Sequence, residues 1–177
     1  LMTWVGSDPS LPPVILMAHQ DVVPVNPGTD ADWTHGPFGG VVADGYIWGR
    51  GAMDDKGSLI AILEAGDALA KSGFTPKRTI IFAFGHDEEV SGKGAQEIFA
   101  LLKSRNVTPA MVLDEGFAVL GNFPLTGKPA ALIGVAEKGY ISLQITATTE
   151  GGHSSRPPRE SGAVRIARAL VALEEKQ

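Results

Sequence analysis

Val14-Ile15-Leu16-Met17-Ala18-His19-Gln20-Asp21 is the stretch of sequence that decides the fold. Its first five residues are apolar without a break, which is typical of a strand buried on both faces of a parallel sheet. Residues 79–84 and 110–113 form two similar, largely apolar runs. Each of the three runs is followed within two residues by histidine or by acidic residues. This repeated arrangement predicts three buried strands with chemically active side chains at their ends.

Two helical patterns separate the predicted strands. Apolar residues recur at helical spacing over residues 57–72 and again over residues 94–104. The order strand, helix, strand, helix, strand predicts an α/β fold, a three-layer, mostly parallel sheet with helices on both faces. In such sheets the functional site lies at the carboxyl ends of the strands. We therefore expect the polar residues that follow the strands to meet at one edge of the sheet.

The pattern changes after residue 135. Apolar and polar residues alternate over residues 141–147, which predicts a half-exposed antiparallel strand, and residues 163–173 have helical spacing. Earlier in the chain, Asp44-Gly45 lies between two short apolar segments and predicts a β-hairpin. We expect residues 1–134 to form one domain and residues 135–177 to begin a second, small α+β domain.

The composition excludes several functional classes. The chain has 177 residues, of which 15 are basic and 20 are acidic, and a formal net charge of −5. The chain has no run of basic residues, so nucleic acid and an anionic membrane surface are not expected partners. It also has no run of 18 apolar residues that would predict a membrane-spanning helix. The absence of cysteine excludes disulfides, cysteine zinc sites and thiol catalysis. The sequence contains no signal-like segment and leaves the compartment open, with cytoplasmic and secreted locations both compatible.

A transition-metal site without cysteine needs histidine and carboxylate ligands. The candidates follow the predicted strands or lead into the first helix: His19, Asp21, Asp54, Asp55, Glu88, Glu89, Asp114 and Glu115. A carboxylate can bridge two cations, and two adjacent glutamates allow one to bind metal while the other acts as a general base. Helix capping by Asp54-Asp55 and a solvated surface role for residues 87–89 are the alternatives.

Five stretches carry a resemblance to a known family. They are residues 19–25, 49–57, 85–89, 114–116 and 151–155. Together they resemble the co-catalytic di-zinc metallopeptidases, which include carboxypeptidase S, Gly-X carboxypeptidase, aminoacylase and glutamate carboxypeptidase. The segment from Trp33 to Phe38 and the Gly-His-Asp-Glu-Glu form of residues 85–89 are most similar to the carboxypeptidase S branch.

The resemblance implies two zinc ions, with Co²⁺ or Mn²⁺ as alternatives, held by four residues: His19, Asp54, Glu89 and Asp114. Asp54 would bridge both ions, His19 and Asp114 would bind the first, and Glu89 would bind the second. The family supplies one more histidine to the second zinc from a position after its lid domain. The four histidines of this chain do not match that position: His19, His35, His86 and His153. We therefore expect the chain to be a fragment that is inactive by itself.

The resemblance also implies catalytic roles. Glu88 would be the general base that activates the water between the two ions, and Asp21 would lie beside His19 and orient it. His153, on a lid over residues 135–177, would help to bind the substrate carbonyl oxygen, and the lid would form a homodimer. The implied reaction is hydrolysis of a C-terminal peptide bond or an N-acyl amino acid amide, so small peptides or N-acyl amino acids are the expected substrates. A non-catalytic scaffold and a related metal aminopeptidase or deacylase are the alternatives.

Overall fold

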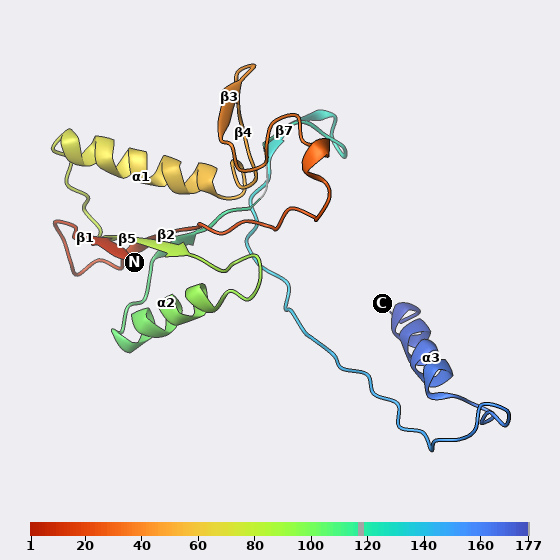
Figure 1. Cartoon of the computed structure of the whole chain (residues 1–177). Coiled ribbons are helices and arrows are strands. Elements are labelled where there is room, and N and C mark those ends of the chain that lie inside the picture. Colours follow the sequence, from red (N-terminus) through yellow and green to blue (C-terminus); the bar gives the residue numbers. More distant parts are fainter. Residues whose placement is uncertain (117–118, 177) are drawn as a thin grey trace. The chain divides into compact units, whose positions relative to one another are not determined.

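The computed structural model describes residues 1–116 and 119–176. The chain separates into two compact units, Leu1–Ile133 and Gly134–Gln177, and each is described by itself. Within these described residues, the first unit contains the sheets and the helices α1 and α2, and the second contains α3 (Figure 1). The assignment of these units to a catalytic domain and a lid stays a prediction.

A four-stranded sheet organises the first unit. Its strands, in spatial order, are β1 (Met2–Trp4), β5 (Ile80–Gly85), β2 (Val14–His19) and β6 (Met111–Leu113). β2 pairs in parallel with both β5 and β6, which confirms the predicted parallel arrangement, and β1 adds an antiparallel edge strand. In this register His19 lies opposite Gly85. The carboxyl ends of β2 and β5 therefore meet at the same edge of the sheet.

Helices cover both faces of this sheet. Figure 1 shows α1 (Lys56–Lys71) on one side and α2 (Lys93–Ser104) on the other, which confirms the three-layer α/β fold. Both helices begin one residue before the range predicted from the sequence. None of the helices in the described part of the chain is long and apolar enough to cross a membrane.

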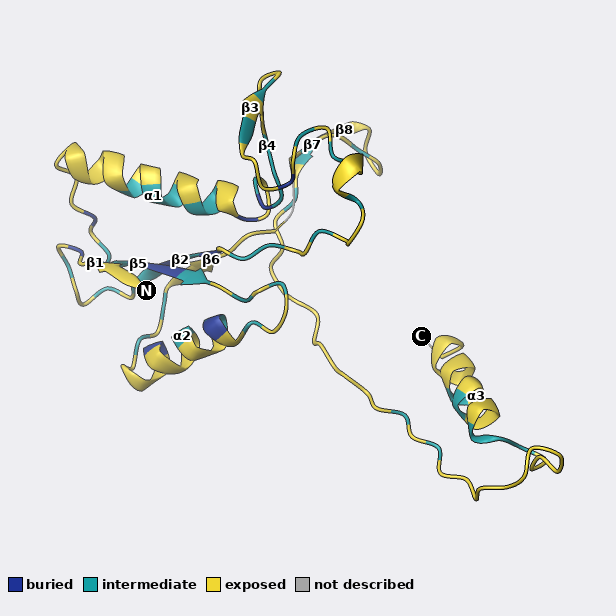
Figure 2. Ribbon diagram, viewed as in Figure 1, coloured by how far each residue is buried: buried dark blue, intermediate teal, exposed yellow. Residues whose placement is uncertain are grey.

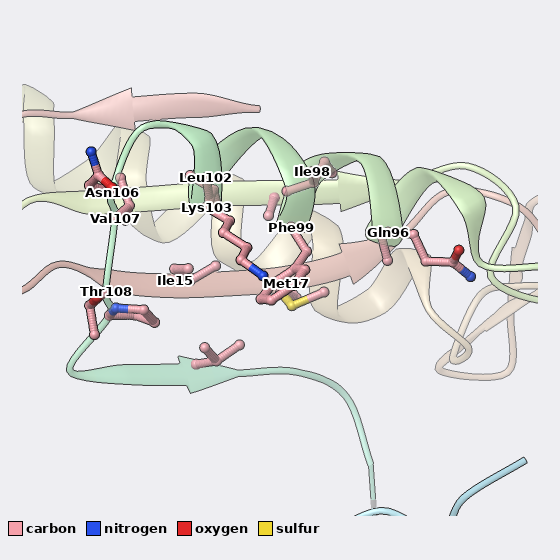
Figure 3. A pocket seen from close by; sticks show the side chains of 14 residues that line it. Ile15, Met17, Gln96, Ile98, Phe99, Leu102, Lys103, Asn106, Val107 and Thr108 are labelled. Atoms are coloured by element: carbon pink, nitrogen blue, oxygen red, sulfur yellow. The ribbon is translucent and has the colours of Figure 1, made fainter.

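The hydrophobic core lies between α2 and the sheet. Its buried members come from β2, β5 and α2: Ile15, Ile81, Ala83 and Leu102 (Figure 2). A pocket of about 750 Å³ opens beside this core, and the side chains of Met17, Ile98 and Phe99 help to line it (Figure 3). Fewer side chains cover β6 than β5. Val112, in the middle of β6, is 48 % exposed.

Two hairpins accompany the main sheet. β3 (Val41–Ala43) and β4 (Tyr46–Trp48) form the predicted hairpin, and Asp44 and Gly45 at its turn have φ angles of 53° and 81°. Positive φ at both turn residues is the requirement of a type I′ turn, which explains the Asp-Gly pair. The hairpin of β7 (Val119–Phe123) and β8 (Lys128–Ala131) and the short 3₁₀ helix Asp30–Asp32 were not predicted from the sequence.

The second unit corrects one expectation. It contains α3 (Gly162–Glu174), where the sequence predicted a helix, and the Ser161 hydroxyl caps this helix by accepting a hydrogen bond from the Val164 amide. The predicted strand over residues 141–147 is wrong, because these residues have no regular secondary structure. Ile141 and Leu143 are 74 % and 64 % exposed, and no strand in the described part of the unit pairs with them. An alternating pattern forms a strand only when a partner satisfies its backbone hydrogen bonds.

We predict that Ile81→Ala will lower the free energy of unfolding by about 2–5 kcal/mol, because it leaves a cavity in the core. Ile81 is 4 % exposed. Ile60→Ala, on the 54 % exposed side of α1, should change stability by about 0.5 kcal/mol or less. Denaturant unfolding of both variants measures the difference, and equal losses would contradict the assignment of the core.

Candidate metal centre

His19 is the centre of the site. It ends β2 with 3 % of its side chain exposed, and its Nδ1 lies 3.0 Å from the carbonyl oxygen of Asp21. An Nδ1–H donor to this oxygen leaves Nε2 as the free, ligating nitrogen. The Nε2 atom lies 2.9 Å from Asp54 Oδ1, 3.2 Å from Glu115 Oε1 and 4.0 Å from Glu88 Oε2. Carboxylates from three separate segments thus converge on one imidazole nitrogen.

The loop before α1 brings two aspartates to this histidine. Asp55 is buried, and its Oδ2 accepts a hydrogen bond of 3.2 Å from the His19 backbone amide. Asp55 makes no side-chain capping bond to α1, so the structure does not support the capping alternative for this residue. Gly51 has a φ of 78°, and a Cβ there would lie 2.2 Å from Val22 Cγ1. A glycine at this position lets the loop pass close to the segment that follows β2.

Asp21 connects the ends of β2 and β5. Its two carboxylate oxygens accept hydrogen bonds from the backbone amides of Glu88, at 3.1 Å, and Glu89, at 3.0 Å. Burial alone would raise the pKa of Asp21, but these two hydrogen bonds outweigh it and hold the pKa below its ordinary value. The ionised carboxylate fixes the backbone of both glutamates beside His19.

The three successive acidic residues after β5 have different surroundings. Asp87 accepts hydrogen bonds from the Lys93 and Gly94 amides and from the Ser91 hydroxyl, so it stabilises the start of α2. The Glu88 side chain is 53 % exposed. The Glu89 Oε1 atom is buried and has no hydrogen-bond partner in the part of the chain that the structure describes. A buried carboxylate oxygen without a donor is costly, and a bound cation satisfies it.

The charges of the site also favour a cation. Partial burial, followed by the negative charges of Asp54 and Asp55, raises the pKa of Glu115 to about 7. Burial lowers the pKa of His19, but the hydrogen bond with Asp54 and the charge of Glu115 outweigh it and raise the pKa overall. In both residues nearby carboxylates raise the pKa, which shows that several negative charges lie close together, and a divalent ion would neutralise them.

Two groups of side chains offer ligand atoms close enough for a shared ion. His19, Asp55 and Glu115 form one group, and His19, Glu88 and Glu89 form the other, with the ligand atoms of each group within 4.8 Å of one another. Imidazole nitrogen and carboxylate oxygen suit Zn²⁺, Co²⁺ and Mn²⁺. Together with the orphaned oxygen of Glu89, this donor set fits a transition-metal site.

Comparison with known proteins places the chain in a family. The model of the family described as Peptidase family M20/M25/M40 matches residues 15–176. The chain belongs to this peptidase family. This finding agrees with the resemblance to carboxypeptidase S and its relatives, and it accounts for the convergence of histidine and carboxylates at the sheet edge.

Relatives and solved structures give the same assignment. The M20 chain is 47 % identical over 177 residues to the N-fatty-acyl-amino acid synthase/hydrolase PM20D1 of Bos taurus, covering 99 % of this chain and 35 % of the relative. It is 40 % identical over 178 residues to carboxypeptidase S of Saccharomyces cerevisiae, covering 97 % of this chain and 30 % of the relative. The chain thus spans about a third of the length of the curated relatives that it matches.

A solved structure supports the fold. The crystal structure of human carnosine dipeptidase 1 matches with a TM-score of 0.54 and 28 % identity, over 64 % of this chain and 24 % of that chain. An M20 family metallo-carboxypeptidase from Sulfolobus solfataricus matches with a TM-score of 0.53 and 23 % identity, over 64 % of this chain and 24 % of that chain. Both neighbours are larger enzymes, and the likeness covers the fold of the part that they share with this M20 chain.

The structure places the predicted residues unequally. His19, Asp21, Asp54, Glu88 and Glu89 lie together at the ends of β2 and β5 and in the loop before α1. His153 belongs to the second unit, where its Nδ1 contacts the Ser155 hydroxyl at 2.8 Å. The proposed role of His153 at a substrate carbonyl therefore stays a prediction.

The two acids after β6 have different surroundings, and the ligand role of Asp114 stays a prediction. Asp114 is exposed, and its Oδ1 accepts a hydrogen bond of 3.0 Å from the backbone amide of Glu115. Glu115 instead extends its carboxylate to His19 Nε2. In this structure one of the two adjacent acids contacts the backbone of the other, while the second contacts His19. The sequence contained both candidates. A strand of three residues is too short to show which of the two acids that follow it faces the same side as His19.

This difference yields a direct test on two neighbouring residues. Glu115→Gln should lower the affinity for zinc roughly tenfold or more, because it removes a charged oxygen donor beside His19. Asp114→Asn should leave metal content close to that of the unchanged protein. Metal analysis after dialysis against limiting zinc compares the two nearly isosteric variants. Loss of metal from Asp114→Asn alone would restore Asp114 as the ligand that the sequence predicts.

Proposed function

We propose that the protein to which this chain belongs is a metal-dependent hydrolase of amide bonds in small peptides or N-acyl amino acids. The observation that carries the proposal is the pair Glu88 and Glu89, which Asp21 holds beside His19 in different environments. Glu89 has a buried, unpartnered oxygen suited to a metal ion, whereas Glu88 is half exposed and open to a substrate. Glu89 is therefore suited to bind a metal ion, and Glu88 is suited to act as the general base.

The donor atoms would hold two zinc ions. The ligands in this proposal are His19, Asp54, Glu89 and Glu115. Oxygens of Asp54 and Glu115 lie 2.9 Å and 3.2 Å from His19 Nε2, Glu89 has the buried oxygen without a partner, and the resemblance to the family implies that Asp54 would be shared by both ions. The ions would supply Lewis acidity that polarises the substrate carbonyl and makes water acidic enough to deprotonate near neutral pH. The buried Asp55 would hold the His19 backbone in place through its hydrogen bond to the amide.

Glu88 would move the proton in this reaction. As the water oxygen attacks the carbonyl carbon, the Glu88 carboxylate accepts a proton from the water. Glu88 then gives this proton to the amide nitrogen as the carbon–nitrogen bond breaks, so that a carboxylic acid and an amine form, and the acid passes its remaining proton to the amine to give a carboxylate and an ammonium ion. His153 would donate a hydrogen bond to the carbonyl oxygen on which negative charge develops.

The substrate class has support from two kinds of relative. One is named as an N-fatty-acyl-amino acid synthase/hydrolase and another as carboxypeptidase S. Both names describe chemistry at an amide bond next to an amino acid. We infer that the substrate of this protein carries such a bond.

The two glutamates should differ when each is changed to glutamine in the full-length protein. Glu88→Gln should lower kcat by roughly 10²–10⁴-fold with little change in zinc content, because the shape remains and the base is lost. Glu89→Gln should lower zinc content as well as rate. Steady-state kinetics on a panel of N-acyl amino acids and dipeptides, together with metal analysis, measure both effects.

Asp87→Asn provides the matched control, since Asp87 is the third acid of the same segment and contacts α2 instead of His19. Its zinc content should equal that of the unchanged protein. If Glu88→Gln lost zinc while Glu89→Gln lost only rate, the two roles would be exchanged. Full activity in both variants would exclude the mechanism.

A further inference from the structure

A second pocket lies next to the loop that carries Asp54 and Asp55. It has a volume of about 510 Å³ and lies between the β3–β4 hairpin, the segment after residue 36 and the first turns of α1. Its walls are mainly apolar and include Pro37, Phe38, Ile47, Trp48 and Ile60. Phe38 and Ile47 are 71 % and 69 % exposed, so the pocket presents apolar surface to solvent. Pockets of 300–1,000 Å³ with apolar walls and few polar groups are typical ligand sites.

Two positive side chains line this otherwise apolar pocket, those of Arg50 and Lys56. Arg50 and Lys56 form no ion pair within residues 1–116 and 119–176. The lysine and arginine residues that do form ion pairs there are Lys71, Arg165 and Arg168. The Nε atom of Arg50 is buried and has no hydrogen-bond partner within the same described residues. A buried N–H group of a charged side chain normally donates a hydrogen bond. The missing partner of Arg50 Nε therefore indicates that a ligand supplies the acceptor.

The position of Arg50 is well defined. Its backbone amide donates a hydrogen bond of 2.7 Å to the Pro37 carbonyl oxygen, and its guanidinium lies 5.1 Å from the centre of the Trp33 ring. The indole nitrogen of Trp48 donates a hydrogen bond to the Ala43 carbonyl oxygen at 3.1 Å. The ring contact and these two hydrogen bonds hold one cation and one aromatic wall of the pocket in place.

The charge of this pocket is opposite to that of the metal centre. The loop over residues 49–57 contributes Arg50 and Lys56 to the pocket, and it carries Asp54 and Asp55 to His19. A free carboxylate is repelled by the acidic group around His19 when no metal is bound, but it is attracted by two unpaired cations. The apolar walls would bury the hydrocarbon part of the same ligand.

We propose that this pocket binds an apolar carboxylate, with Arg50 and Lys56 contacting the carboxylate and with Ile47 and Trp48 contacting the hydrocarbon. The site is separate from the metal centre and the inference does not depend on the proposed hydrolase function. A bound carboxylate would lie against the loop that positions Asp54, so the ligand and the metal centre share one backbone segment.

Binding can be measured without metal or catalysis. The full-length protein, kept in a chelator, is titrated with decanoate, butyrate and decanol, and heat and tryptophan fluorescence are recorded. Decanoate should bind at least tenfold more tightly than butyrate, which lacks most of the hydrocarbon, and than decanol, which lacks the charge. Equal affinity for decanoate and decanol would overturn the ionic part of the proposal, and equal affinity for decanoate and butyrate would overturn the apolar part.

Variants locate the bound carboxylate. Arg50→Gln and Lys56→Gln should each weaken decanoate roughly tenfold and leave decanol unchanged, whereas Arg50→Lys should retain most of the affinity. Lys71→Gln, which changes an exposed lysine that is paired with Asp67, is the control and should bind normally.

Unchanged decanoate binding in the Arg50→Gln/Lys56→Gln double variant would overturn the proposal, as would binding that requires added zinc. Circular dichroism checks that the variants are folded. If a variant does not fold, the comparison of decanoate, butyrate and decanol on the unchanged protein still tests the proposal. Because no step of hydrolysis is measured, failure here leaves the hydrolase proposal intact, and failure of that proposal leaves this one intact.

Discussion

The hydrogen bonds from the Glu88 and Glu89 amides to the carboxylate of Asp21 fix the two glutamates of the candidate metal centre beside His19. They join the segment after β5 to the segment after β2, at the edge where the parallel register has already brought His19 opposite Gly85. The sheet alone places the two strand ends side by side but leaves the following residues free to move. One half-buried carboxylate, that of Asp21, therefore converts a general property of parallel sheets into a defined arrangement of a histidine and two glutamates.

The surroundings of His19 show how such a site is kept folded without its metal. The ring is almost completely buried, yet both nitrogens and the backbone amide have partners: Asp21 at Nδ1, Asp54 and Glu115 at Nε2, and Asp55 at the amide. Burial lowers the pKa of His19, but the hydrogen bond with Asp54 and the charge of Glu115 raise it overall, so these acids stabilise the protonated ring relative to a free imidazole. A positive imidazolium can thus compensate part of the negative charge that a metal would otherwise neutralise.

The sequence predicts the parts of this protein whose interactions are local or strongly periodic. Residues 14–18 and 79–84 were predictable as strands because continuous apolar runs have few other uses, and Asp44-Gly45 specified its own turn. Two elements were not predictable in this way. The short strand at Met2–Trp4 and the state of residues 141–147 both depend on what lies beside them in space. The ligand role of Asp114 stays a prediction, although Glu115 is the acid that lies beside His19. The candidate site was predictable as a set of acids near His19, but the individual partner after β6 was not.

Gly51 has a consequence for how this protein can be altered. Any side chain there would collide with Val22, next to Asp21, and the same loop supplies residues to the candidate metal centre and to the neighbouring pocket. Replacing Gly51 would therefore disturb both places at once. The β3–β4 hairpin offers more freedom, since Val42 and Tyr46 are 77 % and 67 % exposed. A library of variants that changes the hairpin and keeps Gly51 is thus the better starting point for altering what the pocket accepts.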